Sequence, residues 1–110
     1  MWKLSPAEAS ALDEFAVASR ELLGDKLFEL RLFGSRARGE GHEDSDLDVA
    51  VIVTPEGRAR RHEVYDLAWE IGLRHHVDLA PLVIERARLD ELLRRERLLA
   101  LDLERDGIPL

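Results

Sequence analysis

The sequence predicts a small α/β fold in which a short mixed β-sheet is flanked by helices. Three observations support this class. Segments with helical periodicity alternate with segments that have strand periodicity. Residues 47–53 are apolar except for Asp48, as expected for a strand that is covered on both faces. The chain has 110 residues and a mass of 12.5 kDa, which is enough for one domain with its own core.

The first expected element is a helix over residues 6–23. Ser5 and Glu8 form a capping-box pattern at its start, and Pro6 occupies the first helical position, where proline is favoured. Apolar side chains then recur at helical spacing. Gly24 follows as a typical helix stop.

Two strands separated by a long loop are expected next. Residues 27–33 alternate between apolar and charged side chains, which predicts a strand with one covered face. The residues expected on that covered face are Phe28, Leu30 and Leu32. Residues 34–45 are polar and contain three glycines, which predicts a loop. Residues 47–53 then form the strand with two covered faces.

The second half of the chain continues the alternation. Residues 54–57 predict a turn, and residues 58–76 predict a helix with an apolar stripe. Residues 77–84 predict a third strand, in which Pro81 favours a position at the edge of the sheet. Residues 88–106 are expected to be helical again.

Two groups of large apolar side chains can be interpreted in more than one way. Tyr65 and Trp69 are expected in the core or at its flank rather than stacked on a base. The leucines near the C-terminus cover more than one helical face. Either this helix is broken near Arg95 and Glu96, or the leucines form an exposed surface that binds a partner. The two interpretations are compatible, and both stay open.

The composition excludes several classes of function. The chain contains no cysteine, which excludes disulfides, cysteine zinc sites and thiol nucleophiles. Its 16 basic and 23 acidic residues give a formal net charge of −7, which disfavours direct binding of nucleic acid. We find neither a membrane-spanning apolar run nor a signal-peptide core. We therefore expect a cytoplasmic protein without membrane contact, with one domain over residues 1–110.

Asp46 and Asp48 lie at the start of the most apolar strand candidate. Residues two apart in a strand point to the same face, so the two carboxylates stand side by side. Their repulsion and desolvation are costly unless a divalent cation neutralises them, and Mg²⁺ suits carboxylate oxygens. Asp78 starts the next strand candidate and reaches the same face if the two strands are neighbours. Three carboxylates around one point predict a two-metal phosphoryl-transfer site.

Gly34 and Ser35 end the first strand candidate and suit a phosphate group. Glycine lets the backbone approach a ligand closely, and serine offers a hydroxyl and a backbone N–H. Arg36 and Arg38 follow, and arginine is the favoured partner of phosphate oxygens. We expect at least one of these arginines to contact phosphate. The alternative is that they pair with acidic residues of the same loop.

Gly34-Ser35, a ten-residue spacer and Asp46-Leu47-Asp48 together resemble the signature of the DNA polymerase beta superfamily of nucleotidyltransferases. The fuller strings, GSRARG at residues 34–39 and SDLDV at residues 45–49, are similar to its minimal nucleotidyltransferase branch. The resemblance covers most of the chain. Members of that branch commonly have a tyrosine just after the final glycine segment, whereas this sequence reads Ile108-Pro109-Leu110 there, which leaves the last short strand open.

The resemblance implies a role for each motif residue. Asp46 and Asp48 would bind two Mg²⁺ ions, and Asp78 would bind the one that activates the incoming hydroxyl. Gly34 and Ser35 would hold the terminal phosphates of a nucleoside triphosphate such as ATP. The hydroxyl would attack the α-phosphorus and pyrophosphate would leave, with Asp78 as the candidate to help deprotonate the hydroxyl.

The resemblance also implies a protein partner. Family members of this size commonly occur beside a helical HEPN protein, a ribonuclease toxin, and act as its antitoxin by adenylylating a tyrosine. The expected function is therefore transfer of AMP from ATP to a hydroxyl of such a partner, in a homo- or hetero-oligomer. Two alternatives remain: a catalytically silent antitoxin that acts by contact, and a nucleotidyltransferase of small molecules such as aminoglycosides.

Overall fold

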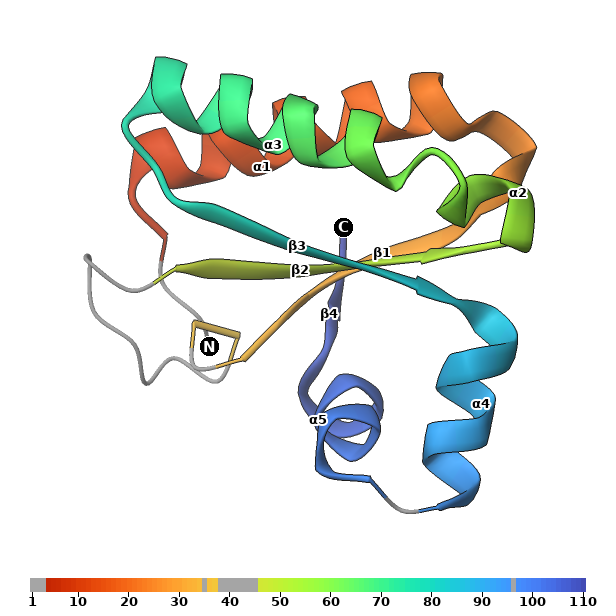
Figure 1. The fold of residues 1–110 in the computed structure, drawn as a ribbon. Helices are drawn as coiled ribbons and strands as arrows, with labels where there is room; N and C mark the ends of the chain where they lie inside the picture. The colour runs from red at the N-terminus through yellow and green to blue at the C-terminus, as the bar shows by residue number, and fades with distance from the viewer. Residues whose placement is uncertain (1–3, 35, 38–45, 96) are drawn as a thin grey trace.

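A four-stranded mixed sheet forms the middle layer of the molecule. The computed structural model describes residues 4–34, 36–37, 46–95 and 97–110. Helices α1 and α3 cover one face of the sheet, and α4 and α5 cover the other (Figure 1). The elements in chain order are α1 (Pro6–Leu23), the 3-10 helix η1 (Gly24–Lys26), β1 (Leu27–Phe33), β2 (Leu47–Val53), α2 (Pro55–Arg58), α3 (Arg61–His75), β3 (Leu79–Glu85), α4 (Arg86–Arg94), α5 (Leu98–Asp106) and β4 (Ile108–Pro109). The predicted α/β class is confirmed.

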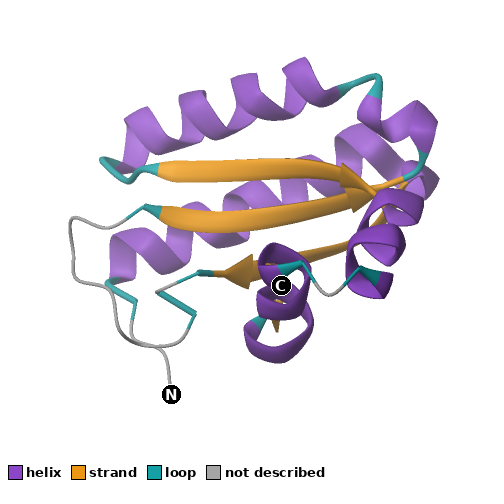
Figure 2. Cartoon of the chain, turned by 60° about the horizontal axis from the view of Figure 1, so that its bottom comes forward, coloured by secondary structure: helices purple, strands orange, loops and turns teal. Residues whose placement is uncertain are grey.

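The central position in the sheet belongs to β2. The strand order is β3-β2-β1-β4. β2 pairs with β1 in antiparallel and with β3 in parallel orientation, and β4 adds to the outer side of β1. Figure 2 shows two neighbouring strands that point one way and a third that points the other way. Hydrogen bonds on both edges therefore hold β2 in place.

Side chains of β2 alternate between two apolar clusters. Val49 and Val51 point to the larger cluster, which α1 and α3 complete, and Ala50 and Ile52 point to the smaller one. The fully buried side chains that α4 and α5 contribute to the smaller cluster are Leu89, Ala100 and Leu103. The prediction that residues 47–53 form a strand covered on both faces is confirmed.

The start of α1 is stabilised as the sequence predicts. The Glu8 backbone N–H donates to the Ser5 hydroxyl at 3.1 Å, and the Ser5 backbone N–H donates to the Glu8 carboxylate at 2.8 Å. This pair is a complete capping box. The helix ends at Leu23, directly before Gly24, as expected.

The bounds of two predicted helices differ in the structure. The prediction of a turn over residues 54–57 is wrong, because Thr54 caps the short helix α2 there and α3 begins only at Arg61. The helix predicted over residues 88–106 begins earlier, at Arg86, and is broken near Arg95 into α4 and α5, which confirms one of the two interpretations. The leucines of α5 that remain exposed are Leu98, Leu99 and Leu101.

Phe28 does not lie on the covered face of β1. The register between β1 and β2 shifts between Leu27 and Glu29, which marks a β-bulge. The extra residue turns Phe28 outward, and 58% of it is exposed. Leu30 and Leu32 are buried as predicted.

The structure also gives the bounds and positions of the two outer strands. β3 begins at Leu79 rather than at residue 77, and it lies at the edge of the sheet as Pro81 indicates. A short last strand is present, because Ile108 and Pro109 pair with β1. Within the described ranges, no helix is long and apolar enough to span a bilayer.

Candidate active site

Asp46 and Asp48 lie where β2 enters the sheet. Asp48 is half-buried on the face of β2 that also carries Ala50 and Ile52, whereas Asp46 precedes the strand and is exposed. Burial raises the pKa of the Asp48 carboxyl above its ordinary value, and the neighbouring charge of Asp46 raises it further. The two carboxylates are therefore close enough to repel each other, as the sequence predicts.

Asp78 lies beside this pair because of the way in which α3 leads into β3. α3 ends at His75, the following His76 has a left-handed conformation, and the Val77 N–H donates to the Gly72 carbonyl at 3.0 Å. The Leu47 N–H then donates to the Asp78 carbonyl at 2.9 Å, which continues the parallel register of β2 and β3. The expectation that these two strands are neighbours is confirmed.

Gly34 lies directly against the Asp48 carboxylate. Its φ of +79° is in the left-handed region that favours glycine. A Cβ atom at this position would overlap with Oδ2 of Asp48. Glycine at residue 34 thus lets the chain turn after β1 while the Asp48 carboxylate occupies the space that any other side chain would fill.

The carboxylates fit a hard divalent cation. Within the described part of the chain, no arginine or lysine forms an ion pair with Asp46 or Asp48, although Asp48 is half-buried. A cation such as Mg²⁺ would relieve both the repulsion and the burial that raise the pKa of Asp48. The described side chains include no gathered group of three or more His, Cys, Asp or Glu that could hold a metal. Asp78 is therefore a neighbour of the pair in this structure rather than a member of a closed cluster.

The sequence profile of the nucleotidyltransferase domain matches residues 12–100, which include β1, β2, β3 and the carboxylates described above. This chain belongs to the nucleotidyltransferase domain family. A relative from Methanocaldococcus jannaschii, MJ1305, whose name gives protein adenylyltransferase as a provisional activity, is 39% identical over 77 residues. The matched part is 67% of this chain and 52% of MJ1305, so the nucleotidyltransferase domain spans about half the length of that relative.

Two solved structures have the same fold. One is a toxin–antitoxin with AMP-PNP, with a TM-score of 0.50 and 23% identity over 86% of this chain and 68% of that chain. The other is a mutant of the toxin–antitoxin MntA–HpeT, with a TM-score of 0.50 and 20% identity over 84% of this chain and 67% of that chain. At these identities the likeness shows the fold of the nucleotidyltransferase domain alone.

Arg36 is held by α1 in this nucleotidyltransferase domain. Its guanidinium donates two hydrogen bonds to the Glu8 carboxylate, at 2.6 and 2.7 Å, and both side chains are buried. The hydrogen bond from Arg36 is the main cause that holds the pKa of Glu8 below its ordinary value. The phosphate contact expected for Arg36 therefore stays a prediction. To make it, Arg36 would have to bind phosphate in addition to Glu8.

The remaining predicted phosphate ligands cannot be placed. Ser35 and Arg38 lie outside the described residues. Glu8 is a residue near the site that sequence analysis assigned only to the helix cap. Its burial was not signalled by the capping-box pattern, because that pattern does not reveal the partner on a distant segment.

A pocket of ≈ 320 Å³ lies beside Asp46 and Asp78 of the nucleotidyltransferase domain. Its lining includes Asp46 and Asp78 together with Trp69 and Leu73 from α3. Trp69 is 71% exposed, so it lies outside the core, at its flank. Nothing in the sequence pattern alone connects Trp69 or Leu73 with the carboxylates. The two residues are four positions apart and lie outside the buried stripe of α3, and this spacing indicates that they share an exposed face of the helix.

Proposed function

We propose that this domain transfers the AMP moiety of ATP to a hydroxyl group of a partner protein. The observation that carries the proposal is the repelling pair Asp46 and Asp48 at the start of β2, with Gly34 against Asp48 and Asp78 on the neighbouring segment. A family that transfers nucleotides explains why a protein would keep this costly arrangement on its most buried strand.

The proposed reaction is a displacement at the α-phosphorus of ATP. The hydroxyl oxygen of the acceptor forms a bond to the α-phosphorus, and the bond from that phosphorus to the bridging oxygen breaks. Pyrophosphate leaves with the electron pair of the broken bond. The hydroxyl proton passes to a base, for which Asp78 is the candidate because it is exposed and adjacent to Asp46.

Asp46 and Asp48 would hold divalent cations, with Asp78 as a further ligand. When bound, such cations neutralise the phosphate charge and lower the pKa of the attacking hydroxyl. Gly34 contributes a backbone that can approach phosphate closely on the β1 side of Asp48. The prediction that Ser35, Arg36 and Arg38 add phosphate donors belongs to this proposal.

The relatives support a protein as the acceptor. MJ1305 is named for protein adenylyltransferase activity, and both structures of the same fold are toxin–antitoxin structures. One of them contains AMP-PNP, an analogue of ATP. The other is a mutant with two Asp-to-Glu substitutions two positions apart, the same spacing as Asp46 and Asp48 here. We propose a helical HEPN toxin as the partner and the role of antitoxin for this chain.

The test is transfer of label from α-³²P-ATP in the presence of Mg²⁺ and the candidate partner. We expect Asp46→Asn to abolish labelling of the partner while the far-ultraviolet circular dichroism spectrum stays unchanged. Asp13→Asn is the matched control, because Asp13 is an exposed aspartate on α1. Labelling that persists in purified Asp46→Asn protein would refute the assignment of the site.

A second candidate function is neutralisation of the partner by contact alone. The observation in its favour is that large apolar side chains of α3, among them Trp69 and Leu73, are exposed. The same Asp46→Asn variant separates the two functions. If the variant still neutralises the partner as well as the wild type does, contact is sufficient and nucleotide transfer is dispensable.

A further inference from the structure

One face of α3 presents large apolar side chains to solvent. Tyr65, Trp69 and Leu73 are 39%, 71% and 59% exposed. Residues four apart lie on the same face of a helix, so the three form one continuous row, which we call the α3 row. The row is distinct from the stripe that α3 buries against the sheet, which consists of Val64, Ala68, Ile71 and Gly72.

The α3 row leads into the pocket beside the carboxylates. Trp69 and Leu73 line this pocket of ≈ 320 Å³ together with Asp46 and Asp78. Gly72 lets α3 lie close to the segment that leads into β3, because a Cβ atom at residue 72 would lie 2.5 Å from the carbonyl oxygen of Val77. A molecule bound along the α3 row would therefore extend directly to Asp78.

The sheet order separates this pocket from the proposed phosphate side. β1, which ends next to Gly34, and β3, which follows Asp78, lie on opposite sides of β2. The triphosphate would approach Asp48 from the side of Gly34, so the pocket on the side of Asp78 remains for the second substrate. That second substrate is the molecule that carries the attacking hydroxyl.

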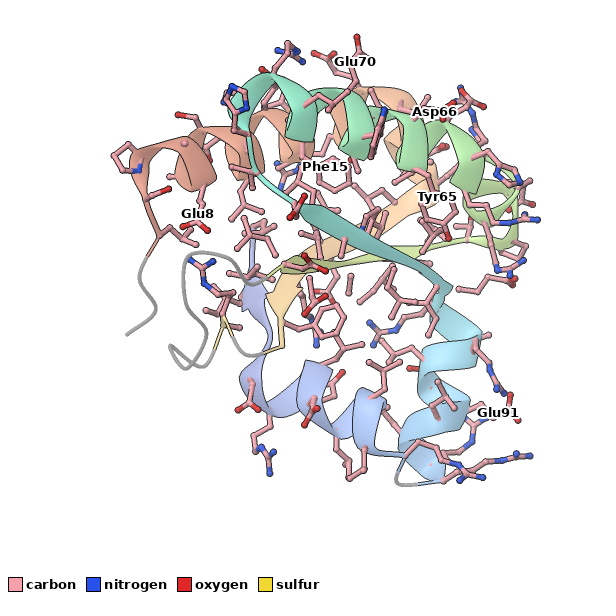
Figure 3. All side chains as sticks on the ribbon, turned by 60° about the vertical axis from the view of Figure 1, so that its left-hand side comes forward. Glu8, Phe15, Tyr65, Asp66, Glu70 and Glu91 are labelled. Carbon is pink, nitrogen blue, oxygen red and sulfur yellow. The ribbon has the colours of Figure 1, made fainter. Side chains whose placement is uncertain are left out.

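Charge indicates what kind of molecule fits the α3 row. Figure 3 shows Asp66 and Glu70 projecting from α3 away from the sheet, and both are exposed next to Tyr65 and Trp69. Asp46 and Asp78 add two carboxylates at the end of the row. The nearby Arg74 is engaged by Glu14, with one hydrogen bond of 2.9 Å. His62 lies against the Tyr65 ring and His76 also lines the pocket, so the acidic rim belongs to the part of the row at Trp69 and Leu73. This part matches a protein segment that has apolar anchors and basic side chains, and it repels nucleic acid.

We propose that the α3 row is the docking surface for the acceptor protein. The acceptor presents a segment with a hydroxyl-bearing side chain, flanked by apolar residues that contact Trp69 and Leu73 and by basic residues that face Asp66 and Glu70. This proposal rests on the proposed function, because it assigns the acceptor side of that same site. It adds the surface and the chemistry that select the partner.

The first test measures binding without turnover. The probe is a fluorescein-labelled peptide in which a tyrosine is flanked by leucines and arginines, and the reference peptide has glutamate in place of arginine. We expect the basic peptide to bind at low salt and Trp69→Ala to weaken its binding roughly 10- to 30-fold, since exposed tryptophans at interfaces are frequent hot spots. Phe28→Ala is the matched control, because Phe28 is an exposed aromatic residue on a different surface.

The second test keeps docking apart from nucleotide binding. We expect Trp69→Ala and Leu73→Ala to leave the calorimetric affinity for AMP-PNP with Mg²⁺ unchanged. A loss of AMP-PNP affinity with unchanged peptide affinity would make Trp69 a part of the nucleotide site and overturn the proposal. Equal binding of the basic and the acidic peptide would overturn it as well.

Three further outcomes have defined meanings. If the wild type self-associates in sedimentation experiments and Trp69→Ala is monomeric, a second copy of the chain covers the α3 row and the proposal is wrong. If the basic peptide binds the α3 row but the wild type transfers no label to any acceptor, docking stands and the proposed catalysis fails. Absence of peptide binding with intact transfer to a protein would overturn the docking surface alone.

Discussion

Gly34 and Asp48 occupy adjoining space at the end of β1. The backbone of Gly34 has a positive φ of +79°, and the missing Cβ leaves room for Oδ2 of Asp48. Gly24 also has a positive φ, of +54°, but nothing lies within 4 Å of its absent Cβ. A substitution at Gly24 therefore introduces backbone strain alone, whereas a substitution at Gly34 introduces backbone strain and also displaces a carboxylate.

We expect Gly34→Ala to lower nucleotide transfer by about 100-fold or more, because the new methyl group must displace the Asp48 carboxylate. A positive φ at a residue other than glycine costs about 1–3 kcal/mol in the free energy of unfolding. Gly24→Ala is expected to show only this second effect, with normal transfer. Equal losses of transfer in the two variants, measured with α-labelled ATP, would show that the contact with Asp48 is irrelevant.

At the scale of elements, the buried pair of Glu8 and Arg36 joins the start of α1 to the turn that follows β1. Glu8 completes the capping box with Ser5 and accepts two hydrogen bonds from Arg36. Arg36 is two residues beyond Gly34, so α1 constrains the turn that lies against Asp48. Removal of one partner from a buried ion pair leaves the other charge uncompensated.

We expect Glu8→Gln to lower the free energy of unfolding at pH 7 by about 3 kcal/mol. The pKa of Glu8 is held below its ordinary value of 4.5, so its ionised form stabilises the folded chain above that pH. As the pH falls below 4.5 and through the lower folded pKa, this stabilisation is lost and the two proteins converge.

Urea unfolding between pH 3 and 7 measures this convergence. Glu63→Gln is the control, since Arg60 lowers the pKa of Glu63 but Glu63 itself is exposed to solvent. A Glu8→Gln penalty that is independent of pH would mean that packing, rather than charge, is the source of the stabilisation.

The success of prediction from sequence differed between kinds of element. The capping box of α1 and the apolar strand β2 were predictable because their signals are local and periodic. The bulge at Phe28 was not predictable, since it depends on the register with β2. Likewise, the exposure of Trp69 depends on what packs against α3, and no periodic pattern within one helix specifies that.

At the site, the residues that could be predicted are those with a local signal in the sequence. Gly34, Asp46 and Asp48 follow from spacing and from the alternation of a strand, and Asp78 follows once β2 and β3 are neighbours. The buried partner of Arg36 could not be predicted, because Glu8 is 28 residues away in sequence. Long-range pairings of this kind require the folded structure.

At the scale of the whole molecule, the proposed function predicts that the stability of the domain depends on cation binding. The Asp48 carboxylate is partly desolvated on the central strand, and both its burial and Asp46 raise its pKa. A ligand that binds only the folded state stabilises it, by about 2.7 kcal/mol at a concentration 100 times the dissociation constant. A cation bound at Asp48 would therefore act on the unfolding equilibrium of the entire chain.

We expect Mg²⁺ to raise the thermal unfolding midpoint of the wild type and to leave that of Asp48→Asn unchanged. In EDTA, we expect the free energy of unfolding of Asp48→Asn to exceed that of the wild type by about 1 kcal/mol at neutral pH. Such a gain is common where a functional group is removed. This advantage shrinks on acidification, because the wild-type carboxyl takes up a proton at its raised pKa. Equal responses to Mg²⁺ in both proteins, followed by circular dichroism, would place the cation elsewhere.

The position of the two aspartates also affects how such a domain can evolve. Because Asp46 and Asp48 repel each other at the end of a strand that is otherwise apolar, substitutions that abolish the charge are not opposed by folding. A duplicated copy released from selection for chemistry would lose these carboxylates early and keep its core and its α3 row. If the α3 row docks the acceptor as proposed, such a copy would be inactive and would still bind its former partner.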